Sequence, residues 1–186
     1  MKIVVAMTGA SGAIYTQRLL DNLDPQQHEI HFISTRHARE VAQLELPKGE
    51  LKIAASVIQY DENGSMFVPF VSGSARLDAM VVIPASMGTI GRVANGASDG
   101  TIARAADVFL KERRKLIFVP RESPYNLIHL RNMATLTEAG ATIIPASPSF
   151  YNKPKTIAEV VDTITARILD HLGIEHKLVK RWQASE

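Results

Sequence analysis

Apolar positions in this chain fall into two patterns that alternate along its length. Lys2–Met7, Glu29–Ser34 and Asp78–Pro84 are short apolar runs rich in β-branched residues. The segments between them place apolar residues every three or four positions. Short apolar runs are typical of strands buried on both faces, and the longer spacing is typical of helices that connect parallel strands. The pattern predicts an α/β fold built on a parallel sheet.

The predicted elements follow one another in the order strand, turn, helix. We expect strands at 2–7, 29–34, 78–84, 115–119 and 141–145. We expect helices at 13–23, 35–46, 86–95, 98–113, 124–139 and 156–172, and another near 50–60 within the irregular stretch 47–76. This alternation predicts one doubly wound, three-layer domain over residues 1–186, Rossmann-like or flavodoxin-like. A polar tail from about 173 is expected to pack on a neighbouring subunit.

Composition limits the classes of function that need to be considered. The 186 residues are 46% hydrophobic and 22% charged, with a formal net charge of +2 and no cysteine. So small a net charge does not favour nucleic-acid binding, and without cysteine there is neither a disulfide nor a catalytic thiolate. No apolar run approaches the roughly 20 residues of a membrane span. The amino terminus leads directly into a strand, unlike a signal peptide, and we expect a cytoplasmic protein.

Residues that could bind a ligand collect where the predicted strands end. They are Gly9–Gly12, Thr35, Ser86–Thr89, Arg121–Glu122 and Ser147–Tyr151. Ligands of open parallel sheets bind beyond these carboxyl ends. The first turn resembles a phosphate cradle, but the sequence lacks both the dinucleotide fingerprint and the P-loop. A phosphate-bearing cofactor is therefore favoured over nucleotide hydrolysis. The histidines show no metal-binding spacing, and we expect no metal.

Two basic residues on one predicted helix allow two interpretations. Arg104 and Lys111 are seven residues apart and project from the same side, away from the apolar residue Ile102. In the first interpretation they belong to a solvated surface, where Asp107 bridges them through weak ion pairs. In the second they serve a site outside their own subunit's core, which requires a subunit interface.

Several longer motifs carry a family resemblance. They are Met7-Thr8-Gly9-Ala10-Ser11-Gly12-Ala13, Pro84-Ala85-Ser86-Met87-Gly88-Thr89, Arg104-Ala105-Ala106-Asp107, Leu110-Lys111-Glu112-Arg113-Arg114, Pro120-Arg121-Glu122-Ser123-Pro124, His129-Leu130-Arg131-Asn132-Met133, Phe150-Tyr151, Ala166-Arg167-Ile168-Leu169 and Arg181-Trp182. In order and spacing, from Lys2 to Trp182 except about 47–70, the chain resembles the UbiX/Pad-type flavin prenyltransferases.

This resemblance implies a reaction, a cofactor and partners. Members of the family bind reduced FMN and transfer a dimethylallyl group to its N5 and C6 from dimethylallyl monophosphate, without a metal. The product, prenylated FMN, serves UbiD-type decarboxylases, as in ubiquinone biosynthesis. Because the family assembles as dodecamers, we expect a homo-oligomer of that size.

The resemblance also implies roles for individual residues. The FMN contacts would be Gly9, Ala10, Ser11, Thr35, Ser86, Met87, Gly88, Thr89 and Arg121. The donor-phosphate residues would be Arg104, Lys111, Glu122, Tyr151 and Arg167, with Trp182 closing the pocket. The catalytic residues would be Ser11, Glu45, Lys111 and Glu122. Glu45 would reach the site from a neighbouring subunit, and Glu122 would carry a proton to the leaving phosphate or anchor the lysine.

Two other functions remain open on the sequence. Pro84–Thr89 also resembles a motif of flavin-dependent cysteine decarboxylases, although those enzymes lack the motifs at 110–114 and 120–124. The second alternative is a module that binds FMN without chemistry. Such a module would need the strand-end turns but neither Arg104 nor Lys111.

Overall fold

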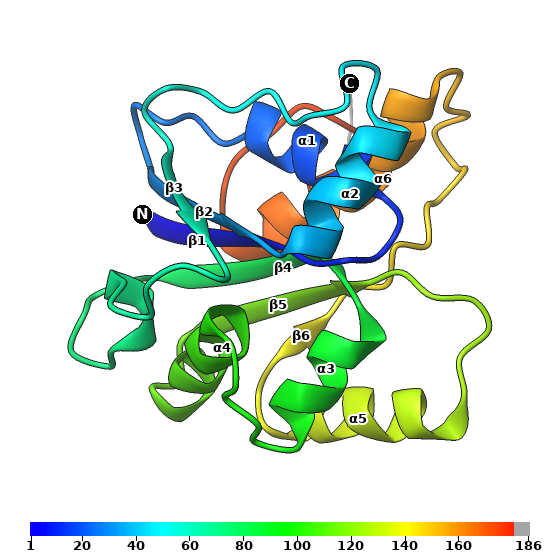
Figure 1. Ribbon diagram of the computed structural model, residues 1–186. Helices are drawn as coiled ribbons and strands as arrows, with labels where there is room; N and C mark the ends of the chain where they lie inside the picture. The colour runs from blue at the N-terminus through cyan, green and yellow to red at the C-terminus, as the bar shows by residue number, and fades with distance from the viewer. Residues whose placement is uncertain (181–186) are drawn as a thin grey trace.

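The computed structural model describes residues 1–180, in which a parallel sheet lies between two layers of helices (Figure 1). The strand order is β3-β2-β1-β4-β5-β6, and every neighbouring pair is parallel. The strands are β1 (Lys2–Met7), β2 (Glu29–Ser34), β3 (Ile58–Asp61), β4 (Ala79–Ala85), β5 (Lys115–Pro120) and β6 (Thr142–Ile143).

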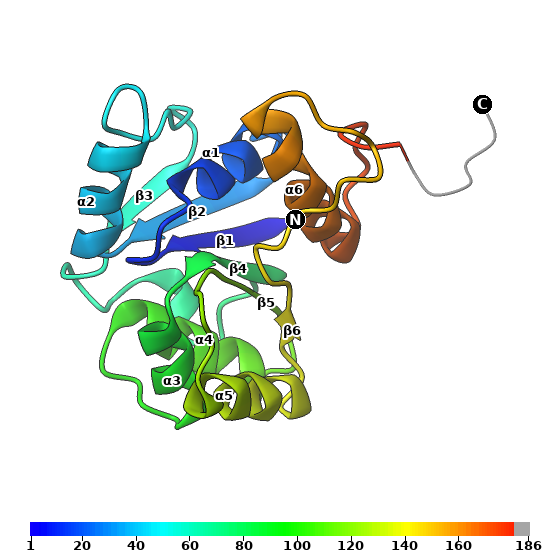
Figure 2. The same cartoon turned by 90° about the vertical axis from the view of Figure 1, so that its right-hand side faces the viewer.

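The helices divide between the two faces of the sheet, as Figure 2 shows from the side. One layer holds α1 (Ala13–Asp21), α2 (Arg36–Glu45) and α6 (Ile157–Leu172). The other holds α3 (Met87–Ala94), α4 (Thr101–Lys111) and α5 (Leu127–Glu138), together with the 3-10 turn η1 (Pro69–Val71). The doubly wound three-layer prediction is confirmed. Within residues 1–180, no helix combines the length and the apolar character needed to cross a membrane.

The expected helix near 50–60 is wrong. Ile58–Asp61 instead forms the edge strand β3, which pairs in parallel with residues 31–34 of β2. A segment of only four residues is too short for the spacing of its apolar residues to distinguish a strand from a helix. The sheet therefore has six strands rather than the five expected.

Because β3 occupies the edge of the sheet, β2 is an internal strand between β3 and β1. His31, which lies on β2, is only 3% exposed and hydrogen-bonds both Tyr60 and Glu29, at 3.0 and 2.9 Å. The histidine ring thus satisfies its polar atoms within the sheet.

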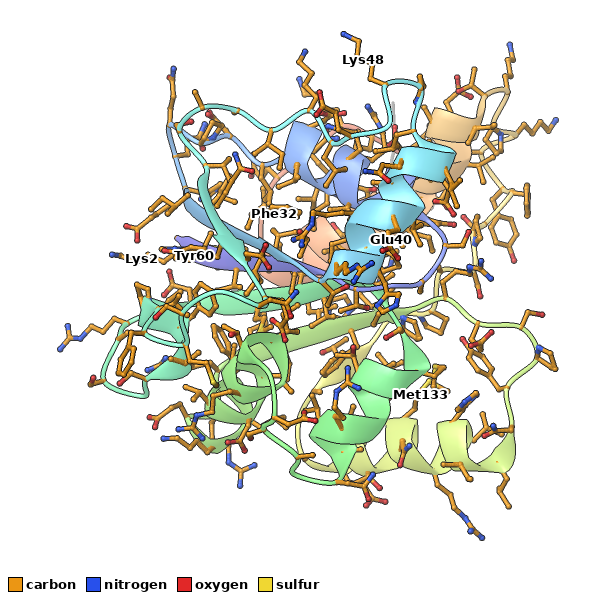
Figure 3. The ribbon with its side chains drawn as sticks, in the orientation of Figure 1. Lys2, Phe32, Glu40, Lys48, Tyr60 and Met133 are labelled. Atoms are coloured by element: carbon orange, nitrogen blue, oxygen red, sulfur yellow. The ribbon has the colours of Figure 1, made fainter. Side chains whose placement is uncertain are left out.

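The core is split by the sheet into two apolar layers. Alternate residues of each strand point to opposite faces, so Val5 and Phe32 pack with α1 and α6, whereas Val4 packs with α3 and α4. Figure 3 labels Phe32 together with Tyr60 on β3, which packs on the opposite layer, and Met133 on α5 beside α3. Because both faces are covered, the strands are apolar throughout, as their sequences indicate.

The chain after α6 turns back at Gly173, whose φ of 78° is in the left-handed region. Ile174 and Leu178 pack against the core of their own chain, and His176 lies 3.1 Å from Asp170. Packing of the tail on a neighbouring subunit stays a prediction. Trp182 lies outside the described residues.

Candidate functional site

The strand order reverses between β1 and β4, so the turns that follow these two strands face each other at one edge of the sheet. The turn after β1 requires glycine at two positions. A Cβ at Gly9 would lie 2.6 Å from the Cβ of His37, and Gly12 has a φ of 116°. The first glycine lets α2 pack against the turn, and the second lets the chain enter α1.

The amides that open α1 are held by a carboxylate of the same subunit. Glu45 Oε2 accepts hydrogen bonds from Gly12 N and Ala13 N, both at 2.8 Å. Glu45, the last residue of α2, lies over the start of α1 of its own chain, since α1 and α2 are in contact; that Glu45 acts in the site of a neighbouring subunit stays a prediction. In this structure the predicted phosphate cradle holds a carboxylate.

The charge of Glu45 is set by four neighbours. Burial raises the pKa of its carboxyl, but hydrogen bonds from Ser11, Gly12 and Ala13 and the charge of Arg121 outweigh burial and lower the pKa overall. Glu45 is consequently an anion at neutral pH, placed beside the hydroxyl of Ser11.

The turn after β4 is tied to the turn after β1 through Thr8, a buried residue. Thr8 Oγ1 donates to Pro84 O at 2.8 Å and accepts from Ser86 N at 2.7 Å. Ser86 in turn caps α3, since its hydroxyl accepts from Thr89 N at 3.3 Å and lies 3.0 Å from the hydroxyl of Thr89. Thr8 was not predicted as a site residue, although it lies within the motif Met7–Ala13.

The first turn of α3 leaves room against its backbone. A Cβ at Gly88 would meet nothing within 4 Å except Arg92 Nη1 at 3.9 Å. Glycine inside a helix costs about 0.5–1 kcal/mol relative to alanine, and the packing of this chain does not require it here. A ligand lying against the backbone would require it. The positive end of the helix dipole at the same turn favours an anionic or electron-rich group.

Arg121 completes the cluster from the end of β5. Its Nε donates to Ser11 O at 3.2 Å, and its charge opposes the rise that burial gives to the pKa of Tyr15. Thr35, at the end of β2, donates its amide to Met7 O at 3.0 Å. The structure thus brings all the predicted FMN residues to one edge of the sheet.

The predicted donor-phosphate residues do not gather there within one subunit. Lys111 ends α4, four residues before β5 begins at Lys115, so it lies near the amino-terminal edge of the sheet. Arg104 pairs with Asp107 at 2.7 Å, whereas Lys111 pairs with Glu112. The proposed bridge from Asp107 to Lys111 is therefore wrong, because the neighbouring glutamate is the nearer partner.

The remaining donor residues lie on exposed surface. Arg167 pairs with Asp170 at 2.9 Å, and the Tyr151 side chain is 79% exposed. Glu122 follows Arg121 directly, and its carboxylate accepts from Ser123 N at 3.0 Å. Through Arg121, Glu122 adjoins the FMN cluster in its own chain.

Known proteins resemble this chain along nearly its whole length. A family model for flavoproteins matches residues 1–169. A flavin prenyltransferase UbiX from Methanocaldococcus jannaschii is 46% identical over 182 residues, 98% of this chain and of that protein. The structure of AnUbiX (PadA1) in complex with FMN and dimethylallyl pyrophosphate is 38% identical, with a TM-score of 0.90 over 100% of this chain and 98% of that one. A dodecameric FMN-dependent UbiX-like decarboxylase from Escherichia coli O157:H7 is 40% identical, with a TM-score of 0.90 over 99% of this chain and 100% of that one.

Proposed function

The chain belongs to the UbiX family of flavin prenyltransferases, and we propose that it transfers a dimethylallyl group from dimethylallyl monophosphate to N5 and C6 of reduced FMN. The observation that carries this proposal is the split of the predicted residues between two places. The FMN residues meet at the edge of the sheet where the strands end, whereas Lys111 lies near the opposite edge, where it is available to another subunit.

The residues at this edge of the sheet fit FMN. The hydroxyls of Ser11, Thr35 and Ser86 offer hydrogen bonds, Gly88 leaves space against α3, and Arg121 supplies a positive charge. When bound, reduced FMN supplies the nucleophilic N5 and C6 of its ring. Glu45 and Ser11 form a hydrogen-bonded pair that can hold or pass a proton at this edge of the sheet.

The donor chemistry needs cations rather than a strong base. Breaking an allylic C–O bond leaves charge on the departing phosphate, and fixed cations stabilise that charge more in the transition state than in the ground state. Arg104, Lys111 and Arg167 are the residues we assign to this role, with Tyr151 donating to a phosphate oxygen. Glu122 either protonates the leaving phosphate or orients Lys111.

The separation of these residues implies that each complete site is shared between subunits. Arg104 and Lys111 of one subunit would face the FMN cluster of another, which requires an assembly with closed symmetry. Side chains such as Phe67 and Leu44, 99% and 88% exposed, offer apolar surface for such contacts. We infer a dodecamer, by analogy with the dodecameric relative.

Three parts of the proposal lie outside the site itself. The prenylated FMN would serve a UbiD-type decarboxylase, including one of ubiquinone biosynthesis. The location would be cytoplasmic. The tail from about 173, with Trp182, would close the pocket of a neighbouring subunit.

One experiment distinguishes prenyl transfer from the two alternative functions. A cysteine decarboxylase or an FMN carrier has no use for Lys111 and Arg104 facing a phosphate. The protein is incubated without air with reduced FMN and either dimethylallyl monophosphate or pyrophosphate, and the flavin is weighed by mass spectrometry. A flavin heavier by one dimethylallyl group supports the proposal. Unchanged flavin with both donors contradicts it.

A further inference from the structure

Helix α4 carries Arg104 and Lys111. Its N-cap residue is Gly100, which has no side chain to cap the helix. A residue distant in sequence supplies the cap. Glu62, directly after β3, accepts a hydrogen bond from Ile102 N through Oε2 at 2.9 Å, and its carbonyl oxygen accepts one from Thr101 Oγ1 at 3.4 Å. A Cβ at Gly100 would lie 2.4 Å from Glu62 Oε1. The carboxylate therefore fills the space in which a capping side chain would stand.

The first turn held by Glu62 is the turn on which Arg104 is placed. The Arg104 amide donates to Gly100 O at 2.8 Å, which closes the first hydrogen-bonded ring of α4. Ile102, whose amide Glu62 accepts, lies inside that ring. The carboxylate of Glu62 thus contacts the turn that carries the Arg104 side chain.

Charged groups surround Glu62 on three sides. Arg92 approaches from α3, Asp99 from the turn before α4, and Asp61 from β3, where it pairs with Arg39 at 3.2 Å. The pKa of the Glu62 carboxyl is raised to about 7: burial is the main cause and the charges of Asp61 and Asp99 add to it, while the Ile102 amide and Arg92 act in the opposite direction.

Arg92 connects this cluster to the FMN edge. Its Nη2 donates to Thr89 Oγ1 at 3.4 Å and its Nε lies 3.6 Å from Asp99. The start of α4 is thereby held against α3, whose first turn carries the FMN residues Ser86 to Thr89.

We propose that Glu62 is a positioning residue for the prenyl donor: its side chain, anchored at the edge strand, fixes the first turn of α4 and so aims Arg104 at the donor phosphate of a neighbouring subunit's site. The inference rests on the proposed role of Arg104. Glu62 touches neither substrate directly. Its effect on turnover is transmitted through the backbone of α4.

The test measures donor KM, kcat and the FMN dissociation constant for three variants at position 62. We expect Glu62→Ala to raise the KM for dimethylallyl monophosphate about 10-fold, with kcat and FMN affinity within twofold of wild type, since it loses roughly one capping interaction. Glu62→Gln keeps an acceptor oxygen in place and is expected to keep the wild-type KM. Glu62→Asp shortens the side chain by one methylene, and its donor KM is expected to lie between those of Glu62→Ala and wild type. This variant keeps the test possible if Glu62→Ala does not fold.

Two controls separate the possible failures. Asn126→Ala removes the cap of α5, which accepts from His129 N at 2.8 Å, and should lower the thermal midpoint without changing donor KM. Arg104→Ala should raise donor KM at least as much as Glu62→Ala. If Arg104→Ala raises KM and Glu62→Ala does not, the positioning role of Glu62 is refuted while the proposed function stands. If wild-type protein makes no prenylated flavin, the proposed function fails first. A Glu62→Gln variant as impaired as Glu62→Ala also refutes the inference.

A pH series provides a readout that an ordinary cap would not give. Because the pKa of Glu62 is raised in the folded protein, the stability it contributes is complete below the ordinary carboxyl pKa and is lost as pH rises through about 7. Relative to Glu62→Gln, wild type should therefore lose about 5 °C in thermal midpoint between pH 5 and pH 8. Parallel curves for the two proteins would show that Glu62 does not occupy the buried cap and would overturn the proposal.

Discussion

At the scale of single residues, the site depends on small groups whose positions are set by backbone geometry. Glycine lets α2 approach at Gly9 and leaves a clear backbone surface at Gly88. Glu45 keeps its charge because amides of α1 and the Arg121 guanidinium face it. The open backbone surface at Gly88 and the charge of Glu45 are therefore in place before a ligand binds. Binding then costs less free energy, because the site does not have to be reorganised.

The Gly88→Ala variant tests whether the space at α3 belongs to the cofactor. The added methyl meets only Arg92 Nη1 at 3.9 Å, so the unliganded protein should be unchanged or more stable by about 0.5–1 kcal/mol. FMN binding should weaken by about 10-fold or more, because the methyl occupies the ligand's surface, at a cost of roughly 1.4 kcal/mol per factor of 10. Calorimetry and flavin titration measure the two effects. In Gly91→Ala, one turn further along α3, FMN affinity should be retained; equal affinity in both variants would remove Gly88 from the site.

Replacing Glu45 by glutamine tests the carboxylate at α1. The pKa of Glu45 is lowered in the folded protein, so its contribution to stability is present above the ordinary carboxyl pKa and is lost as pH falls through the lowered value. Glu45→Gln should therefore melt below wild type at pH 7, by about 2 °C, and the gap should close under acid conditions. Glu40→Gln, which breaks an exposed pair with Arg36 on the same helix, is the control and should show a smaller gap. A gap independent of pH would contradict the assigned charge.

At the scale of elements, α4 presents two different surfaces. Ile102, Ala106 and Phe109 are buried against the sheet, as their spacing predicts. Arg104 and Lys111 are on the other side, where they form local ion pairs with Asp107 and Glu112. Exposed pairs of this kind contribute little to stability, typically below about 1 kcal/mol. The composition of this helix is therefore better explained by a partner surface than by folding.

Lys111→Ala tests that explanation directly. Removing one preorganised cation from a leaving phosphate should slow prenyl transfer by roughly 10²-fold or more, while FMN binding stays intact. Glu112→Ala, which removes the ion-pair partner of Lys111, is the matched control. If Lys111 serves only a surface pair, both variants will turn over like wild type. Single-turnover kinetics with bound reduced FMN distinguish the two results.

At the scale of the whole molecule, the FMN residues of one subunit lie at the carboxyl-terminal edge of the sheet, and its Lys111 lies near the amino-terminal edge. The sheet lies between them: the FMN turns follow the carboxyl ends of the strands, and Lys111 lies four residues before β5 begins. No rearrangement of a packed sheet would bring these together, because the protein interior is close-packed. A second subunit can bring them together without any rearrangement.

Complementation between two inactive variants tests the shared site. Arg121→Ala should lose FMN affinity, and Lys111→Ala should lose transfer. Coexpressed with different tags and purified as mixed oligomers, they should regain a clear fraction of wild-type activity, because some sites receive Arg121 from one subunit and Lys111 from another. Mixtures no more active than the two variants alone, or a monomer by light scattering that still transfers the prenyl group, would contradict the shared site.

The sequence by itself determined the layered fold, and it predicted the FMN residues that this fold brings to one edge of the sheet. Apolar runs with covered faces can only be buried strands, and parallel strands connected by helices deliver Gly9, Ser86 and Arg121 to one edge. The local sequence is enough for these conclusions, because neighbouring residues determine both the spacing of apolar positions in each element and the polar residues at its end.

Tertiary structure alone decided the rest. The short edge strand β3 and the contact of Glu45 with the start of α1 depend on residues brought together from distant parts of the chain. The cap of α4 is the clearest case, because Gly100 gives no local signal and Glu62 lies 40 positions from the amide that it accepts. Such contacts are determined by the packing of whole elements, and no periodicity along the chain records them.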